Sequence, residues 1–202
     1  MSNEEAVGKI PGIILSGGES RRMGSPKALL KYGKSTFAET IVSKFTAAGV
    51  GDISMVLGGG AENLRSKLKI KDLKIIVNPD WSGGQITSLR AALRETDEDA
   101  AAVIVSLIDN PGVEVTTIRL LLKEFLMGDY DIIIPEYKGR GGHPVVFGRR
   151  TFKSILYTEV KNGARDIIRS GKFRVKRLSL DDPGIRQDID TPADYEKLVN
   201  KV

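Results

Sequence analysis

Three observations on this sequence predict an α/β protein with a mainly parallel sheet and helices on both of its faces. Short apolar runs alternate with helical patterns along the chain, as they do in proteins built from strand–helix–strand units. Most of these runs are too uniformly apolar for half-exposed strands, which indicates a sheet covered on both sides. The length of 202 residues suits one large core. We therefore expect a single domain over residues 1–202, with an ordered core at about residues 9–200.

The expected elements follow one another in alternation. Strands are predicted at residues 10–15, 53–57, 73–77, 101–107, 131–135, 144–147 and 173–178. Helices are predicted at residues 36–48, 61–68, 87–95, 115–127, 149–157, 164–169 and 192–200. Ligands of such sheets bind beyond the carboxyl ends of the strands. The loops after Leu15, Val77, Leu107 and Pro135 are therefore the expected place for chemistry.

Composition limits the classes of function. The net charge of +5 favours anionic ligands. Aromatic residues make up only 6% of the chain and are not interleaved with the basic ones, which argues against a nucleic-acid-binding platform. No apolar run reaches membrane-spanning length, and the acidic start of the chain does not resemble a secretory signal. The chain has no cysteine, so it has no disulfides or thiolate metal sites, and we expect a cytoplasmic protein.

The loop after the first apolar run has the chemistry of a phosphate-binding loop. Residues 16–27 contain three glycines, three cations and one acid. Gly17 and Gly18 allow backbone amides to approach phosphate oxygens, while Arg22 and Lys27 can neutralise a triphosphate. The spacing fits neither a dinucleotide-binding fingerprint nor a P-loop, since the Gly33-Lys34-Ser35 segment lacks a glycine at position 28. The alternative is an ordinary glycine-rich turn on a basic surface.

The pattern Leu15-Ser16-Gly17-Gly18-x-Ser20-x-Arg22-Met23-Gly24-x-x-Lys27 resembles the signature of the MobA-like NTP transferase superfamily. This superfamily includes the molybdenum cofactor cytidylyl- and guanylyltransferases. The resemblance implies a Rossmann-like three-layer sandwich of the nucleotide-diphospho-sugar transferase type. It also implies a Mg²⁺-bound triphosphate, with transfer of a nucleoside monophosphate and release of pyrophosphate.

Further blocks extend the resemblance over residues 10–199 and supply candidate site residues. Gly84 and Ser88 lie in a Gly-x-x-x-Ser-Leu segment that contacts the nucleotide in the family, although the same segment also reads as a helix start with a Ser or Thr cap. Asp109 follows an apolar strand, where it could hold a hard cation or simply begin a turn. Asp190 precedes Thr191-Pro192 in an ending that completes the metal site in the family, and Asp188 is an alternative ligand.

The remaining blocks concern the acceptor. His143, the only histidine, lies in a Gly-His-Pro segment, and Arg165 lies in an Asn-Gly-Ala-Arg segment. Both are typical of the cytidylyltransferase branch, where they border the acceptor pocket. A lone histidine is more often structural, and most of the basic residues near Arg165 read as a solvated face. We treat His143 as a pocket-lining residue rather than a general base, because a phosphate acceptor is already ionised.

The sequence thus predicts a Mg²⁺-dependent nucleotidyltransferase in which Arg22, Lys27 and Asp109 are catalytic. Leu15, Ser16, Gly17, Gly18, Lys27, Gly84 and Ser88 are the expected nucleotide-binding residues, and Asp109 and Asp190 the metal ligands. CTP is the favoured donor and GTP the next, because Gly17 is guanylyltransferase-like whereas the other blocks are cytidylyltransferase-like. The expected acceptor is a phosphorylated pterin, with a sugar phosphate or another small phosphate as alternatives. A non-catalytic nucleotide-binding regulator, or an accessory protein that delivers the cofactor to a molybdoenzyme partner, also remains open.

Overall fold

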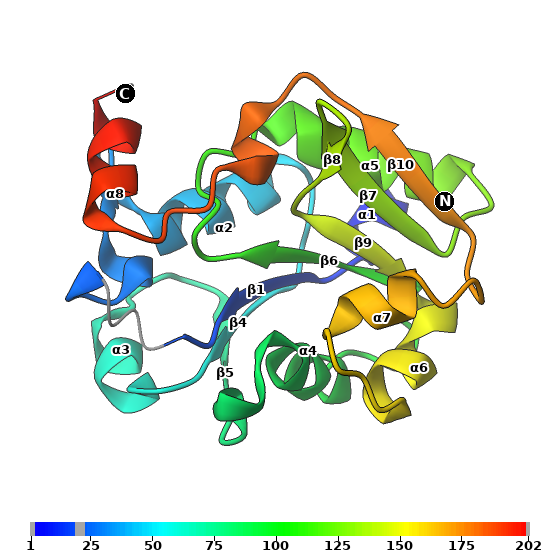
Figure 1. Ribbon diagram of the computed structural model, residues 1–202, viewed down its shortest axis with the longest axis horizontal. Helices are drawn as coiled ribbons and strands as arrows, with labels where there is room; N and C mark the ends of the chain where they lie inside the picture. The colour runs from blue at the N-terminus through cyan, green and yellow to red at the C-terminus, as the bar shows by residue number, and fades with distance from the viewer. Residues whose placement is uncertain (1–2, 19–22, 201–202) are drawn as a thin grey trace.

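The computed structural model describes residues 3–18 and 23–200 and shows a mixed eight-stranded sheet with helices on both faces (Figure 1). The strands run in the order β10-β7-β9-β6-β1-β4-β5, with β8 paired to β7. Their bounds are β1 Gly12–Ser16, β4 Ile53–Leu57, β5 Leu73–Val77, β6 Ala102–Leu107, β7 Ile132–Tyr137, β8 Arg140–Gly141, β9 Val145–Gly148 and β10 Val175–Ser179. A separate two-stranded hairpin joins β2 Lys31–Tyr32 to β3 Ser35–Thr36.

Alternate side chains of the strands fill two apolar cores, one on each face of the sheet. Ile14, Met55 and Ile104 belong to the first core, and Ile13, Val56 and Val105 belong to the second, as the two-residue period of a strand requires. The first core is closed by side chains from α2 Phe37–Ala47, α3 Ala61–Lys67, α5 Val115–Met127 and α8 Pro192–Val199, with α1 Asn3–Gly8 packed against it. The second is closed by α4 Gln85–Arg94, α6 Phe152–Tyr157 and α7 Ala164–Ile168.

The strand directions confirm the predicted mainly parallel, mixed sheet. The pairs β1–β4, β1–β6, β4–β5 and β7–β10 are parallel, whereas β9 is antiparallel to both β6 and β7. The reversal at β9 follows from its short connection to β7 through β8, because parallel strands need a longer crossover. The carboxyl ends of β1, β4, β5 and β6 therefore lie along one edge of the sheet.

The predicted bounds of strands and helices match the structure where the apolar periodicity is strong. They differ from it where individual residues determine where an element begins or ends. The strands at 53–57 and 73–77 and the helix at 115–127 are confirmed. The strand predicted to end at Pro135 continues to Tyr137, so the loop expected directly after Pro135 is wrong. The strand predicted from residue 10 starts only at Gly12, since Pro11 has no amide hydrogen for the ladder. The 149–157 helix begins as a 3₁₀ turn, η4 Arg149–Thr151, before α6.

The sequence-based prediction also missed several short elements. These are α1, the β2–β3 hairpin, β8 and three 3₁₀ turns: η2 Lys27–Leu29, η3 Trp81–Gly83 and η5 Pro183–Arg186. Within residues 3–18 and 23–200, none of the helices has the length and apolar character needed to cross a membrane.

Candidate nucleotide site

A pocket of about 430 Å³ opens at the carboxyl edge of the sheet, the position that ligands take in parallel sheets. It receives residues from the ends of β1 and β6, from the loop before η2, from the η3–α4 segment and from the segment before α8. The described residues that line it are Leu15, Gly17, Gly18, Met23, Lys27, Trp81, Ser82, Gly84, Gln85, Ser88, Leu107, Ile108, Asp109 and Asp190. Four segments that are far apart in the sequence thus meet in one pocket.

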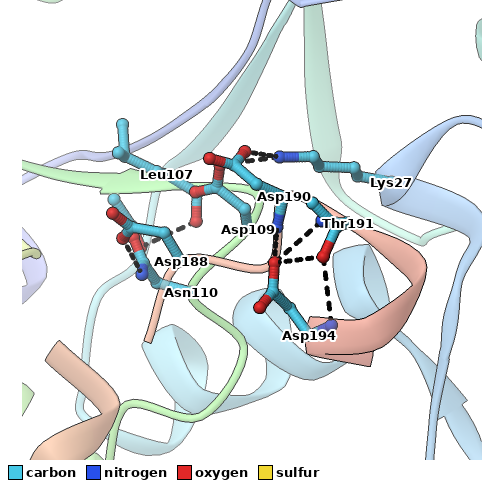
Figure 2. Close-up of polar contacts among 9 residues, drawn as sticks. Lys27, Leu107, Asp109, Asn110, Asp188, Asp190, Thr191 and Asp194 are labelled. Atoms are coloured by element: carbon cyan, nitrogen blue, oxygen red, sulfur yellow. Dashed lines mark hydrogen bonds and ion pairs between the residues drawn. The ribbon is translucent and has the colours of Figure 1, made fainter. Parts of the chain in front are cut away.

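Lys27 joins the two candidate metal ligands at one side of this pocket (Figure 2). Its ammonium donates to Oδ2 of Asp109 at 3.0 Å and to Oδ1 of Asp190 at 2.7 Å. The Lys27 and Asp109 side chains are only 12% and 17% exposed, whereas Asp190 is 45% exposed. A cation bound between two carboxylates in a partly buried site makes stronger hydrogen bonds than neutral groups do.

Burial and charge shift the pKa values of this group. Burial raises the pKa of Asp109, and the nearby carboxylates of Asp188 and Asp190 raise it further, so that the opposing effect of Lys27 is outweighed. Burial by itself would lower the pKa of Lys27, but the charges and hydrogen bonds of Asp109 and Asp190 together raise it above its ordinary value. Lys27 therefore stays protonated at neutral pH. Ionisation of Asp109 costs free energy in the folded protein.

The residues around Asp109 fit a hard metal ion such as Mg²⁺. Asp109 Oδ1 and Asn110 Oδ1 are buried without a hydrogen-bond partner among the described residues, so the first of them offers a free carboxylate oxygen beside Asp190. Carboxylate oxygens are the ligands that Mg²⁺ and Mn²⁺ prefer. Across the described residues no cluster of three or more acidic or histidine side chains is close enough to form a complete cage. Two carboxylates, completed by water and phosphate oxygens, suit the way Mg²⁺ binds nucleotides.

Asp188 has a supporting contact of its own (Figure 2). Its Oδ1 accepts a hydrogen bond of 2.9 Å from the side-chain amide of Asn110, which is buried next to Asp109. The backbone is also joined here, since the amide of Ile189 donates to the carbonyl of Asp109 at 3.1 Å. These contacts link the loop after β6 to the segment that carries Asp190.

Asp190 is held in place by the start of α8. Thr191 is the N-cap, and its side chain accepts from the amide of Asp194 while the Asp194 carboxylate accepts from the Thr191 amide and hydroxyl. Pro192 occupies the first turn. This capping box fixes the backbone directly after Asp190. Hydrogen bonds from Thr191 lower the pKa of Asp194.

We predict that Thr191→Ala lowers the free energy of unfolding by about 1 kcal/mol and weakens catalysis by displacing Asp190. Because the folded-state pKa of Asp194 is lowered, the contribution of this carboxylate is present above its unfolded pKa and is lost as pH falls through its folded pKa. Urea unfolding at pH 7 and at acid pH measures the loss of stability and its dependence on pH. Thr191→Ser keeps the hydroxyl and is the matched control; equal destabilisation by both substitutions would contradict the capping role.

Asn78 organises the start of α4, which contributes Gln85 and Ser88 to the pocket lining, and it was not predicted from the sequence. Its buried amide donates to the hydroxyls of Thr87 at 2.9 Å and Ser88 at 3.0 Å, and its Oδ1 accepts from the amide of Asp80. Helix α4 begins at Gln85, with Gly84 as a cap that makes no side-chain hydrogen bond. The expected Ser or Thr cap is therefore wrong: Thr87 and Ser88 lie within the first turn, and Asn78 orients them.

A second unpredicted contact supports the Asp109 loop from the other side. Lys44 on α2 donates to the carbonyl of Pro111 at 2.7 Å, and burial lowers the pKa of its ammonium. Nothing in the sequence distinguishes Lys44 from other lysines of a helical pattern. Asn78 also gives no signal, since an asparagine after a strand is common in turns.

Close backbone packing sets the position of the glycine-rich loop. A β-carbon on Gly17 would lie 2.8 Å from the Ser88 hydroxyl, and one on Gly58 would lie 2.2 Å from the Gly17 carbonyl oxygen and 2.7 Å from Cβ of Trp81. Gly58 thus lets the loop after β1 lie directly against the end of β4.

We predict that Gly58→Ala weakens nucleotide binding about tenfold or more. The Gly17 carbonyl oxygen must move away from the added β-carbon, and a shift of about 1 Å in a binding site disturbs the positioning of a ligand. The measurement is an equilibrium titration with nucleotide. Gly8→Ala is the matched control, since a β-carbon at Gly8 would meet no atom within 4 Å. Unchanged affinity in Gly58→Ala would show that the glycine-rich loop does not set the nucleotide position.

His143 and Arg165 both lie outside the pocket lining, but His143 is within electrostatic range of Asp109, Asp188 and Arg165. Burial lowers the pKa of His143, and the carboxylates only partly oppose this effect. Nδ1 lies 3.4 Å from the carbonyl oxygen of Val105, and a carbonyl accepts only, so this contact favours the neutral tautomer with its proton on Nδ1. Arg165 is exposed at the start of α7. The pair thus provides a ring whose neutral form is favoured by burial, with an exposed cation within electrostatic range of it.

The structure brings most of the expected site residues together. Leu15, Gly17, Gly18, Lys27, Gly84, Ser88, Asp109 and Asp190 line one pocket, whereas Ser16 is buried at the end of β1 and does not line it. Arg22, the other expected catalytic cation, lies outside the described residues. Trp81, Met23 and Gln85 line the pocket without having been predicted.

Comparison with known proteins places the chain among proteins of similar length. It is 29% identical to nicotine blue oxidoreductase of Paenarthrobacter nicotinovorans, over 94% of this chain and 96% of that protein. It is 25% identical to the molybdenum cofactor cytidylyltransferase of Escherichia coli K12, over 91% and 92% of the two chains. The crystal structure of Rv0371c from Mycobacterium tuberculosis H37Rv superimposes with a TM-score of 0.82 at 28% identity, over 96% and 99%. That protein has also been crystallised with manganese, with a TM-score of 0.79 at 26% identity, over 96% and 99%.

Residues 12–177 match the family described as the MobA-like NTP transferase domain. This span runs from β1 into β10 and contains the glycine-rich loop, Lys27 and Asp109, while Asp190 lies beyond it. The chain therefore belongs to the MobA-like NTP transferase family and is an enzyme of the nucleotidyltransferase class.

Proposed function

We propose that this enzyme transfers a nucleoside monophosphate, in a Mg²⁺-dependent reaction, from a nucleoside triphosphate to a phosphorylated pterin of the molybdenum cofactor type. The observation that carries the proposal is the Lys27 ammonium between Asp109 and Asp190 at the rim of a pocket of nucleotide size. A cation and two carboxylates at one point are what a metal-bound triphosphate requires.

The proposed reaction joins two phosphates. An oxygen of the acceptor phosphate attacks the α-phosphorus of the triphosphate, a new P–O–P bond forms, and the bond between the α-phosphorus and the bridging oxygen to the β-phosphorus breaks. Pyrophosphate leaves with the electron pair. No base has to remove a proton from the acceptor, since a phosphate is ionised at neutral pH.

The chain's own residues position the groups and balance their charge. Gly17 and Gly18 present backbone to the phosphates at the end of β1, and the segment from Gly84 to Ser88 receives the nucleoside. Lys27 neutralises charge on the α-phosphate and on the leaving pyrophosphate, a role that Arg22 would share. Asp109 and Asp190 would hold Mg²⁺, which when bound neutralises the phosphate oxygens. Positioning and charge neutralisation are the main sources of rate in such transfers.

The acceptor is proposed to enter from the side of His143 and Arg165. Arg165 can pair with an anionic group there. Neutral His143 can contact a ring system without the cost of desolvating a charge. CTP is the favoured donor and GTP the next, because the blocks around Lys27, His143 and Arg165 resemble the cytidylyltransferase branch and Gly17 resembles the guanylyltransferase branch. A molybdoenzyme that receives the product is the expected protein partner.

The test starts with thermal unfolding in the presence of CTP, GTP, ATP or UTP, each with and without Mg²⁺. A ligand that binds only the native state raises the melting temperature, and we expect the largest Mg²⁺-dependent shift with CTP. Release of pyrophosphate is then measured with the stabilising nucleotide and a molybdopterin acceptor. Tight binding without pyrophosphate release would favour a non-catalytic regulator, and no shift with any nucleotide would overturn the proposal.

A second candidate function comes from the relative named nicotine blue oxidoreductase. Hydride transfer at the same pocket would need a nicotinamide or flavin cofactor and would not need the Lys27–Asp109–Asp190 group. Incubation of the protein with NADH or NADPH and an oxidised dye tests this function directly. Oxidation of the reduced cofactor without pyrophosphate release in the first assay would favour the oxidoreductase.

A further inference from the structure

The arrangement around Lys27 places a cation where the proposed metal would bind. The ammonium lies between Asp109 Oδ2 and Asp190 Oδ1, at 3.0 Å and 2.7 Å. Two oxygens that bind one Mg²⁺ at about 2.1 Å each must lie within about 4.2 Å of each other, and the ammonium already contacts one oxygen of each expected ligand. A metal ion held by these two carboxylates would compete with the ammonium for Asp190 Oδ1 and would be repelled by it at close range, even if the ion also takes the Asp109 Oδ1 that the ammonium leaves unbound.

From this overlap we infer that Lys27 acts as an internal counter-ion that weakens metal binding to the empty enzyme, and that the triphosphate lifts this block by drawing the ammonium onto its phosphates. The inference rests on the metal ligands of the proposed function. It assigns to Lys27 a role before the chemical step, in addition to its contact with phosphate. Metal alone would bind weakly, whereas nucleotide and metal would bind with positive coupling.

Burial makes a shift of the ammonium away from the two carboxylates costly. The Lys27 side chain is only 12% exposed, so moving it away from Asp109 and Asp190 without a new anion would leave a charge in a partly desolvated site. Lys27 lines the same pocket as Gly17 and Gly18, the expected phosphate-binding glycines, and a triphosphate bound there supplies a new anion for the ammonium.

The experiment is a titration of the nucleotide-free protein with Mn²⁺, followed by the electron paramagnetic resonance signal of the free ion. We expect Lys27→Met to bind Mn²⁺ about tenfold or more tightly than the wild type, because two charge-assisted hydrogen bonds no longer compete with the metal. Lys27→Arg keeps the charge and should stay close to the wild type. Lys34→Met removes one positive charge at an exposed position and controls for net charge.

A double variant, Lys27→Met with Asp109→Asn, locates the bound ion, since it should lose the added affinity. Thermal unfolding provides a second readout: Mn²⁺ should raise the melting temperature of folded Lys27→Met more than that of the wild type. Equal Mn²⁺ affinity in the wild type and Lys27→Met would overturn the inference while leaving the metal ligands of the proposed function intact. Absence of Mn²⁺ binding in all variants, even with nucleotide, would instead overturn the metal assignment itself.

Discussion

Pyrophosphate release by Lys27→Ala is expected to be about 10²–10³-fold slower than by the wild type, the usual cost of removing one group that stabilises transition-state charge. The loss should appear mainly in kcat, because charge on the leaving pyrophosphate develops during the reaction and is smaller in the bound substrate. The fold should survive, since Asp190 is 45% exposed and water can solvate it, while burial raises the pKa of Asp109 and so eases its protonation once the ammonium is gone. Initial rates and thermal unfolding of the same preparation separate the two effects.

Two further variants make the result specific to Lys27. Lys34→Ala removes an exposed cation from the nearby hairpin connection and should keep wild-type rates. Lys27→Arg keeps the charge but replaces a compact ammonium by a planar fork, so it should recover only part of the rate. Wild-type turnover by Lys27→Ala would rule out the catalytic assignment made from the sequence.

Periodicity in the sequence was sufficient to predict most of the fold. Uniformly apolar runs such as 53–57 and the repeating apolar face of 115–127 are long enough to identify their elements without tertiary information. The β2 and β3 strands contain two residues each, so no alternation can be detected in them. The passage of β7 beyond Pro135 depends on pairing with β10 and β8, which a local pattern does not contain.

The members of the site were predicted better than their arrangement. Loop composition indicated Lys27 as an expected phosphate-binding cation. The position after an apolar strand indicated Asp109 as an expected metal ligand, and the family resemblance added Asp190. Their mutual contact joins residues 82 and 163 positions apart, and only the folded sheet brings them together. The supporting contacts of Asn78 and Lys44 were missed for the same reason, because their partners Ser88 and Pro111 are set by tertiary packing.

The second large effect is expected from Asp109→Asn, which should lower activity but raise stability. Asp109→Asn should lower pyrophosphate release by about 10³-fold. The substitution removes the negative charge that attracts the metal ion, and a neutral amide is a poor ligand for a hard cation. The same substitution should raise the melting temperature at neutral pH. Ionised Asp109 is costly in the folded state, since burial and the carboxylates of Asp188 and Asp190 raise its pKa.

The sign of the stability effect depends on pH in a defined way. A carboxyl whose folded-state pKa lies above its unfolded value stabilises the fold fully below the unfolded pKa, and this contribution is lost as pH rises through the folded pKa. The gain from Asp109→Asn should therefore be large at pH 7 and shrink towards pH 4. Melting curves across this range in the presence of a chelator measure it, with the exposed Asp181→Asn as a charge-matched control. A lower melting temperature of Asp109→Asn at pH 7 would mean that the ion pair with Lys27 outweighs burial, and that Asp109 stabilises the fold in addition to serving the reaction.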